Sequence, residues 1–299
     1  MTTLLLVRYG ELGLKSAPVR REFERTLRRN ILAQFAGERR TCRIRSDHGH
    51  IYVEVDDSDF GLRLLQRVFG ITSVSPVHEV PSEVDAIRSA VLQMADRVLA
   101  PGSRFAIRAR RTGQHSFTSQ DLARDIGGTV LERWRDRGVT VDLEEPMVEL
   151  TVEVRGPKTY LYSERRPGPG GLPLGVAGKV VALVDGPRGA LGAYLMMKRG
   201  CYCGLVAPPS GRPYVQEVLV RFDPKAPTNF PGEDPMLWEQ ALRDLSESGR
   251  ADGVVLPIGV EDYPDAKSRW GDRVLFSPTV GFTDAEVESR WRSVKDLVA

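Results

Sequence analysis

The sequence predicts two consecutive α+β units followed by an α/β unit built on a parallel sheet. Residues 3–80 give the order strand, helix, two strands, helix and strand, and residues 84–165 give a second mixed set of helices and strands. Segment 166–178 is dense in glycine and proline, which excludes a helix or a central strand and indicates a boundary. From residue 179 onward strands and helices alternate, which is the pattern of a parallel sheet covered by helices.

The first unit begins with an apolar strand at Thr3–Arg8 and a helix opened by Pro18, whose fixed φ suits the first helical turn. That helix carries an apolar stripe at helical spacing. The other elements expected here are strands at Cys42–Arg45 and His50–Val55, a helix at Phe60–Phe69 and a strand at Ile71–Val80. A β-α-β-β-α-β order defines the ferredoxin-like unit.

The second unit contains two amphipathic helices and three strands. Thr118 or Ser119 can cap the second helix with its hydroxyl group, and Gly156 with Pro157 forms the turn of a closing hairpin. The helices are expected at Val84–Leu99 and Ser119–Trp134, and the strands at Phe105–Arg110, Met147–Arg155 and Thr159–Arg165.

The third unit alternates apolar strands with helices. Strands are expected at Lys179–Val184, Tyr202–Ala207, Gly253–Gly259 and Val274–Ser277, and helices at Ala190–Arg199, Met236–Ser246 and Asp284–Val298. We therefore expect a ferredoxin-like domain at 1–60 whose last strand lies at 71–80, a second domain at 61–165, a linker at 166–178 and an α/β domain at 179–299.

Composition places the chain among ordinary globular proteins. Of its 299 residues 41% are hydrophobic, and no apolar run approaches the length of a membrane span. The first ten residues lack the basic start of a secretory signal. Three cysteines are too few for a disulfide framework and fit a reducing compartment. We therefore expect a cytoplasmic protein.

Basic residues are concentrated at the front of the chain. The net charge is only +2, yet the first fifty residues hold 11 Lys and Arg against 5 Asp and Glu. Most of the basic residues are arginines, whose planar guanidinium binds phosphate with two parallel hydrogen bonds. This distribution indicates a nucleic-acid partner, and solvated surface charge is the alternative. The same two interpretations apply to the arginine-rich face of the first helix, which includes Arg20 and Arg21.

Three stretches carry a more specific pattern. They are VRYGELGLKSAPVRREFERTL at 7–27, FAIRARRTGQHSFTSQDLARDIG at 105–127 with VEVRGPKTYLYSERRPGPGGLPLG at 152–175, and GKVVALV with GAYLMMKRGC at 178–184 and 192–201. Together they resemble the tRNA 4-thiouridine synthetase, or tRNA sulfurtransferase, family. The resemblance implies a ferredoxin-like domain, a THUMP domain that holds tRNA, and a Rossmann-like PP-loop ATP pyrophosphatase domain, in that order.

The resemblance places RNA binding on the first two domains. On a strand, Arg104, Arg108 and Arg110 project to one face. The helix that follows begins near hydroxyl side chains, and free amides at a helix N-terminus bind phosphate well. The expected RNA-binding residues are Lys15, Arg20, Arg21, Arg108, Arg110, Arg111, His115, Ser116, Thr118 and Ser119. A salt-bridged strand and an ordinary helix cap are the alternative interpretation.

The sequence departs from the family where ATP would bind. The family's loop reads Ser-Gly-Gly-x-Asp-Ser, whereas this chain has Val-Asp-Gly-Pro-Arg-Gly at 184–189. Both serines are absent, Pro187 lacks an N–H donor, and Arg188 stands at the acidic position. Leu183, Gly186 and Arg188 are the candidate nucleotide-binding residues of this loop. The late cysteines of the family are also missing, and Cys201 and Cys203 are interpreted as structural, with a redox or metal role as the alternative.

These observations favour a tRNA-binding protein that grips the acceptor end and has lost ATP-dependent adenylation. An active tRNA uracil 4-sulfurtransferase with ATP, Mg²⁺ and a partner sulfur donor is the alternative. A nucleotide-binding regulator in which Arg188 holds an anion is a third possibility. We assign no catalytic residue, no metal ligand and no certain cofactor. By resemblance we expect a homodimer, a modification-enzyme or sulfur-carrier partner, and no membrane association.

Overall fold

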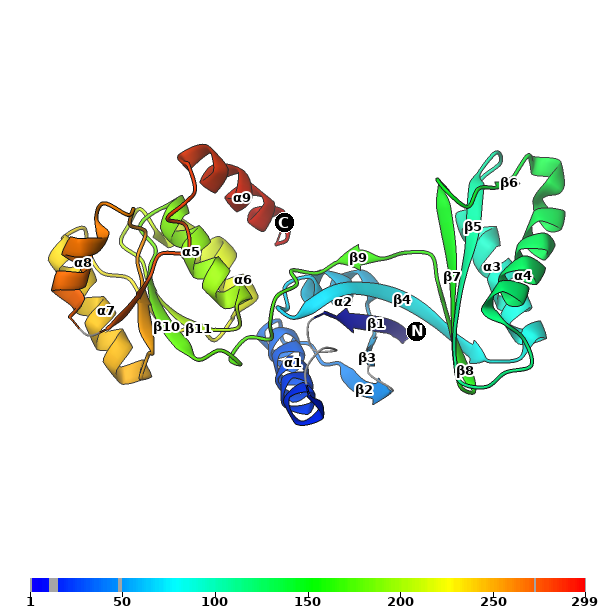
Figure 1. Ribbon diagram of the computed structural model, residues 1–299, viewed down its shortest axis with the longest axis horizontal. Coiled ribbons are helices and arrows are strands. Elements are labelled where there is room, and N and C mark those ends of the chain that lie inside the picture. The colour runs from blue at the N-terminus through cyan, green and yellow to red at the C-terminus, as the bar shows by residue number, and fades with distance from the viewer. Residues whose placement is uncertain (1, 11–15, 48–49, 272, 299) are drawn as a thin grey trace.

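The computed structural model describes residues 2–10, 16–47, 50–271 and 273–298. Three bodies lie along the long axis of the molecule, with the ferredoxin-like domain in the middle (Figure 1). The second domain and the C-terminal α/β domain lie on either side of it (Figure 1). The fold class predicted from the sequence is therefore confirmed. Lys15 lies outside the described residues.

A single mixed sheet joins the first two domains. Its strand order in the described residues is β2-β3-β1-β4-β8-β7-β5-β6, and a short β9 (Arg166–Pro167) pairs with β4 at the side. The strands of the first half are β1 (Thr3–Tyr9), β2 (Arg43–Asp47), β3 (His50–Val55) and β4 (Ile71–Pro81). The first part of β4 pairs with β1, and its last four residues, His78–Pro81, pair with β8. One continuous strand thus belongs to both domains.

Two helices, α1 (Ala17–Gly37) and α2 (Ser58–Leu65), cover the first half of the sheet. Their apolar faces place Leu27, Ile31 and Leu62 in one core with the inward residues of β1 and β3. Helix α2 ends at Leu65, four residues earlier than the sequence predicts. The reason is that Phe69 leaves the helical path and stacks on Phe222 of the C-terminal domain, with 5.3 Å between ring centroids.

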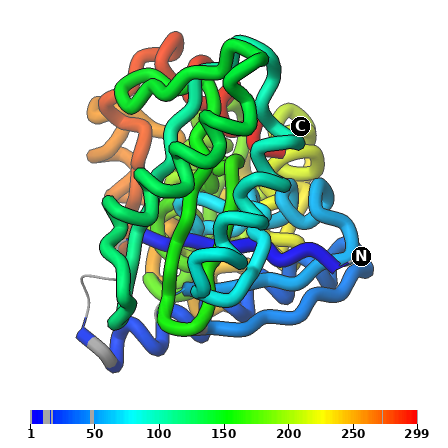
Figure 2. The backbone as a smooth tube through the Cα atoms, turned by 90° about the vertical axis from the view of Figure 1, so that its right-hand side faces the viewer, coloured from blue at the N-terminus to red at the C-terminus, as the bar shows by residue number. Residues whose placement is uncertain are grey.

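The second domain closes the sheet with β5 (Arg104–Thr112), β6 (Thr140–Val141), β7 (Val148–Arg155) and β8 (Lys158–Tyr162). Helices α3 (Val84–Val98) and α4 (Ser119–Trp134), extended by the turn η2 (Arg135–Arg137), pack on one face of it. Both helices lie on the outer side of the molecule, in front of the strands in Figure 2. The other face of the sheet therefore faces the rest of the protein.

The C-terminal domain is a parallel sheet with strand order β12-β11-β10-β13-β14. The strands are β10 (Lys179–Leu183), β11 (Tyr202–Val206), β12 (Thr228–Asn229), β13 (Gly253–Val255) and β14 (Val274–Phe276). Helices α5 (Pro187–Lys198) and α9 (Asp284–Asp296) cover one face, and α7 (Pro235–Gly249) and α8 (Tyr263–Trp270) cover the other (Figure 1).

Short elements in this domain were not predicted from the sequence. They are the π-helical turn η3 (Tyr214–Leu219) with α6 (Val220–Phe222), the two-residue strand β12, and helix α8. Helix α8 buries only Ala266 and Trp270. Two buried positions on eight residues are too few to give a recognisable helical period.

A buried network of ion pairs and hydrogen bonds connects the two halves of the mixed sheet. Glu153 of β7 is 5% exposed and accepts hydrogen bonds from the Tyr162 hydroxyl at 2.7 Å, from Arg155 at 3.1 Å and from Arg8 of β1 at 3.4 Å. The Arg8 guanidinium also lies over the Tyr162 ring and donates to Ser75 of β4. Burial by itself would raise the pKa of Glu153, but the Tyr162 hydrogen bond and the two arginines outweigh it and lower that pKa.

We expect Glu153→Gln to destabilise the protein by about 3–5 kcal/mol, because it leaves two largely buried arginines without a counter-charge. Glu153 has a lowered pKa in the folded state, so its stabilisation is fully present above the unfolded pKa of a glutamate. It is lost as the pH falls through the folded pKa. Urea unfolding of both proteins, followed by circular dichroism from neutral to strongly acidic pH, measures this difference.

Glu149→Gln is the matched control, because Glu149 is an exposed carboxylate on the same strand. Its effect should lie within about 0.5 kcal/mol. Equal stability of the Glu153 and Glu149 variants at neutral pH would contradict the stabilising role of this network.

Candidate nucleic-acid interface and nucleotide loop

The alternation of side chains along β5 sorts its residues between two environments. Phe105 and Ile107 are buried in the core under α3 and α4. Arg104, Arg108 and Arg110 therefore project to the opposite face, as the sequence predicts. That face is not covered by helices and looks toward the other domains (Figure 1).

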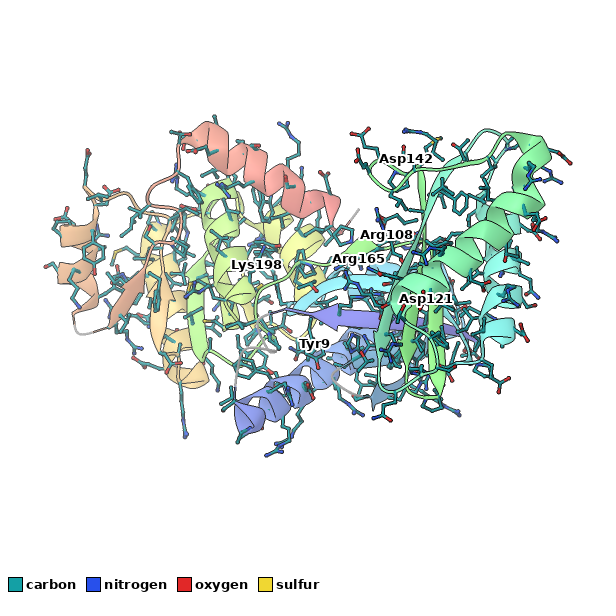
Figure 3. All side chains as sticks on the ribbon, turned by 45° about the vertical axis from the view of Figure 1, so that its right-hand side comes forward. Tyr9, Arg108, Asp121, Asp142, Arg165 and Lys198 are labelled. Carbon is teal, nitrogen blue, oxygen red and sulfur yellow. The ribbon has the colours of Figure 1, made fainter. Side chains whose placement is uncertain are left out.

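A polar depression of about 570 Å³ opens on this face and reaches Ser119, Gln120 and Ala123 in the first turns of α4. Arg108 and Arg110 of β5 line it together with Ser119 of α4. Two further arginines come from distant parts of the chain, Arg8 from β1 and Arg165 from the segment after β8. Figure 3 shows Arg108 and Arg165 on the same side of the second domain. The structure thus brings together arginines that are up to 157 positions apart, from residue 8 to residue 165.

The acidic neighbours of the depression neutralise part of this charge. Glu153 is bound to Arg8 in the network described above, Glu149 lies 3.4 Å from Arg108, and Glu164 pairs with Arg166 outside the depression. Arg165 donates to the Ser73 hydroxyl at 2.9 Å and has no ion pair with the residues that the structure describes. Within the described ranges, Arg110 is exposed and has no hydrogen bond or ion pair. Among the described residues that line this surface, Arg110 and Arg165 are therefore the cations that form no ion pair.

Arg111 lies on the other side of the strand from Arg110. Its guanidinium donates to the carbonyl of Gly113 at 2.7 Å and is exposed. His115 stacks on Phe117 with 5.4 Å between ring centroids, and Ser116 beside it is exposed. These side chains form the tip of the β5–α4 connection and do not line the depression.

The N-terminus of α4 carries a complete capping box. The Thr118 hydroxyl accepts from the amide of Asp121 at 3.1 Å and donates to its carboxylate at 2.6 Å. The same hydrogen bonds lower the pKa of Asp121. The Asp121 carboxylate therefore places a negative charge at the N-terminus of α4, and the Thr118 hydroxyl is used by the capping hydrogen bonds.

Arg20 and Arg21 lie on α1, in a different domain from β5 (Figure 1). Arg20 lies 3.9 Å from Glu24 on the same helix, and both arginines are exposed. The structure does not bring them into the depression lined by Arg110 and Arg165.

The loop after β10 occupies the place where a ligand of an open parallel sheet normally binds. The strand order proceeds from β10 to β11 and β12 on one side and from β13 to β14 on the other. Because the order reverses beside β10, the crevice at the carboxyl ends of β10 and β13 is the topological switch point. Leu183, Gly186 and Arg188 lie at this position, before and within the first turn of α5.

Arg188 is engaged inside the domain. Its guanidinium donates to the carbonyls of Thr279 and Phe282 at 2.8 and 2.9 Å, and to the Asp284 carboxylate at 2.7 Å. Thr279 and Phe282 belong to the segment between β14 and α9, and Asp284 is the first residue of α9. Arg188 thus ties the start of α5 to the closing segment of the domain, and its donors are directed at protein groups.

The loop is also closed from the other side by residues 208–211. The Ser210 hydroxyl donates to the carbonyl of Asp185 at 2.9 Å, and a Cβ on Gly211 would lie 1.6 Å from the carbonyl oxygen of Val184. Only glycine permits this approach. Gly186, in contrast, has an extended backbone and open space where a Cβ would be. The loop therefore requires glycine at Gly211, which no feature of the local sequence singles out, and at Gly189, where a Cβ would lie 2.5 Å from the carbonyl oxygen of Leu183.

Cys201 and Cys203 lie in the core of the C-terminal domain, and burial raises the pKa of both thiols. In the described part of the chain, no group of three or more His, Cys, Asp or Glu side chains could hold a metal ion. Every helix within the described ranges is too short or too polar to cross a lipid bilayer.

Comparison with known proteins places this geometry in context. Residues 4–75 match the ThiI ferredoxin-like domain and residues 81–164 match the THUMP domain. The chain is 40% identical over 204 residues to the probable tRNA sulfurtransferase of Methanothermobacter thermautotrophicus, covering 66% of this chain and 50% of that protein. It is 37% identical over 210 residues to the tRNA sulfurtransferase of Pyrobaculum aerophilum, covering 68% and 42%. The chain thus spans about half the length of the curated relatives it matches.

Two solved structures share the whole architecture. PH1313 from Pyrococcus horikoshii is 26% identical with a TM-score of 0.82, over 98% of this chain and 99% of that one. A 4-thiouridine synthetase solved with RNA and bound ATP is 20% identical with a TM-score of 0.79, over 100% and 86%. The second likeness shows the fold alone. Residues 4–75 thus form a ThiI ferredoxin-like domain and residues 81–164 form a THUMP domain, and the curated relatives that match this part of the chain are named tRNA sulfurtransferases.

Proposed function

We propose that this protein binds tRNA at its acceptor end and serves tRNA modification without carrying out ATP-dependent adenylation itself. The RNA lies on the face of the THUMP sheet that is turned toward the rest of the molecule. The proposal includes a cytoplasmic location, a homodimer, and a modification-enzyme or sulfur-carrier partner. The THUMP domain and the names of the relatives support a role in tRNA modification.

The observation that carries the proposal is that Arg110 and Arg165, in the depression on the uncovered face, form no ion pair with the described residues. Guanidinium groups bind phosphate with charge-assisted hydrogen bonds. A-form RNA offers a regular array of phosphates and conceals its base edges in a deep, narrow major groove. Such a surface recognises the shape and phosphates of RNA more than its sequence.

The contacts of Arg188 support the loss of adenylation. A loop that activates ATP needs donors directed at the phosphates and an acid near the bound metal. In this chain Arg188 donates to Thr279, Phe282 and Asp284, and Pro187 has no N–H group. The burial of Asp185 raises the pKa of its carboxyl group, which weakens it further as a metal ligand.

We expect the double substitution of Arg110 and Arg165 by alanine to weaken binding of many tRNAs by at least tenfold, because each lost charged hydrogen bond contributes about 1.5–3 kcal/mol. The slope of log affinity against log salt should become shallower by about 0.7–0.9 per lost phosphate contact. Fluorescence titration of labelled tRNA over a range of salt concentrations measures both quantities.

Arg135→Ala is the control, because Arg135 is an exposed arginine of the same domain on the helical side. It should leave affinity and salt slope unchanged, and Arg111→Ala should have a smaller effect than Arg110→Ala. Undiminished binding by the double variant, or unchanged affinity for tRNA without its unpaired acceptor end, would count against the proposal.

We expect no tRNA-dependent release of pyrophosphate from ATP by the wild-type protein. Arg188→Ala should instead lower the stability of the C-terminal domain, by about 1.5–3 kcal/mol for the lost charge-assisted hydrogen bonds. It should also speed amide exchange in residues 279–284. Arg292→Ala, an exposed arginine of α9, is the control for stability. Pyrophosphate release by the wild-type protein would favour the alternative, an active tRNA uracil 4-sulfurtransferase.

A further inference from the structure

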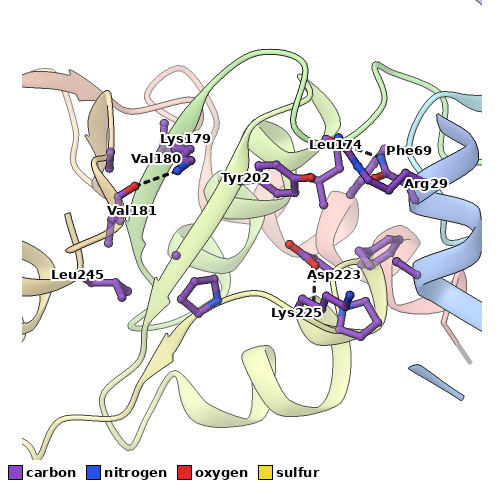
Figure 4. A pocket seen from close by; sticks show the side chains of 18 of the residues that line it. Arg29, Phe69, Leu174, Lys179, Val180, Val181, Tyr202, Asp223, Lys225 and Leu245 are labelled. Atoms are coloured by element: carbon purple, nitrogen blue, oxygen red, sulfur yellow. Dashed lines mark hydrogen bonds between the residues drawn. The ribbon is translucent and has the colours of Figure 1, made fainter. Parts of the chain in front are cut away.

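An apolar cavity lies at the opposite end of the parallel sheet from the loop of Arg188. It has a volume of about 480 Å³ and is lined by the first residues of β10 and β11, including Lys179 and Tyr202 (Figure 4). Helix α1 of the ferredoxin-like domain forms another side. Because parallel strands all start at the same edge, this amino-terminal edge is separated from the switch point by the length of the strands. The volume falls within the roughly 300–1,000 Å³ of small-molecule pockets.

The walls of the cavity are mostly apolar. The aromatic rings of Tyr202 and Phe222 line it together with Leu174, Pro227 and Leu245. The side of α1 is fixed in place, because Gln34 donates to the carbonyls of Arg221 and Phe222 at 3.1 and 2.7 Å. The cavity is therefore preformed by two domains that hydrogen-bond to each other.

One carboxyl group is buried in this apolar surrounding. Asp223 is 8% exposed, and its side chain points across the cavity toward the strand of Tyr202 (Figure 4). Its Oδ1 accepts from the backbone N–H of Lys225 at 3.1 Å. Among the described residues, no hydrogen bond reaches its Oδ2. Burial raises the pKa of this carboxyl group. A ligand with an N–H donor would satisfy the remaining oxygen.

Positive charge surrounds the same space. Arg29, Lys179 and Lys225 are exposed residues that line the cavity, and Asp223 is the single acid among the described lining residues. Lys179 reaches the carbonyl of Gly249 at 3.2 Å. Within the described ranges the ammonium group of Lys225 makes no hydrogen bond or salt bridge, and its charge acts on Asp223. The rim therefore attracts an anionic group, whereas the interior takes an apolar, planar one.

We propose that this cavity binds a purine nucleoside monophosphate, either free or as the terminal residue of an RNA strand. The base lies between the aromatic walls and donates an N–H to Asp223. The phosphate lies among Arg29, Lys179 and Lys225 at the rim. This site is distinct from the loop after β10, and it does not depend on the tRNA-binding proposal.

Calorimetric titration with AMP and GMP tests the proposal in the absence of any RNA. Asp223→Asn and Lys225→Ala should each weaken binding by roughly tenfold, because each removes one charge-assisted contact. Leu245→Trp should abolish binding by filling the cavity. Lys225 is exposed, so its substitution leaves folding intact, and thermal unfolding checks the other two variants.

Two matched controls separate this cavity from other surfaces. Lys295→Ala removes an exposed lysine of α9 and should change nothing. Gly186→Asp introduces a negative charge at the loop after β10, where a Cβ has open space, and should also leave AMP affinity unchanged. Adenosine and ribose 5-phosphate should both bind more weakly than AMP, because each lacks one half of the ligand.

Competition distinguishes the two sources of the nucleotide. Displacement of AMP from the wild-type protein by a short RNA ending in a purine identifies an RNA terminus as the occupant. Binding of AMP without such displacement identifies the free nucleotide. The proposal is overturned if neither AMP nor GMP binds at millimolar concentration, if ribose 5-phosphate binds as tightly as AMP, or if Gly186→Asp removes binding while Leu245→Trp does not.

Discussion

The arrangement of the first two domains depends on β4, a strand that is shared between them. Its first residues pair with β1 and its last residues pair with β8, so the two halves of the mixed sheet cannot rotate freely without breaking its ladder. The Glu153 network adds a second connection, because Arg8 comes from the ferredoxin-like half and Arg155 and Tyr162 come from the THUMP half. Breaking this network would expose or isolate buried charges, which makes it costly to deform. The two domains therefore behave as one platform.

The candidate RNA surface is a consequence of that platform. Arg110 lies on β5, and Arg165 follows β8 and is held by Ser73 of β4. Their separation in space is fixed only because β4, β7 and β8 are neighbours in one sheet. The same neighbours determine which charges remain available, since Glu153 and Glu149 neutralise Arg8 and Arg108. Glu153 lies opposite Arg110 in the register of β5 and β7, but its carboxylate is bound by Arg8, Arg155 and Tyr162. Among the described residues, Arg110 therefore forms no ion pair of its own.

Local sequence patterns predicted the elements that long periodic segments define. The Thr118 cap, the Pro18 start of α1 and the alternation along β5 follow from rules that act within a few residues. Arg165, the partners of Arg188 and the requirement for glycine at Gly211 could not be predicted in this way. Each depends on a segment that is brought close only by the fold. Helix α8 and strand β12 were missed because they are too short to show a period.

The two ends of the C-terminal sheet differ in how their polar groups are satisfied. At the carboxyl end, the guanidinium of Arg188 and the hydroxyl of Ser210 donate to protein carbonyls. The hydrogen bonds that stabilise the loop after β10 therefore use the donors that a ligand would need. At the amino end, Asp223 has one oxygen bound by a backbone amide and lies in an apolar cavity with cations at its rim. A polar group that already hydrogen-bonds within the protein is not available to a ligand, whereas a buried polar atom without a partner is available. By that criterion the capacity of this domain to bind a small molecule lies at the edge where its strands begin.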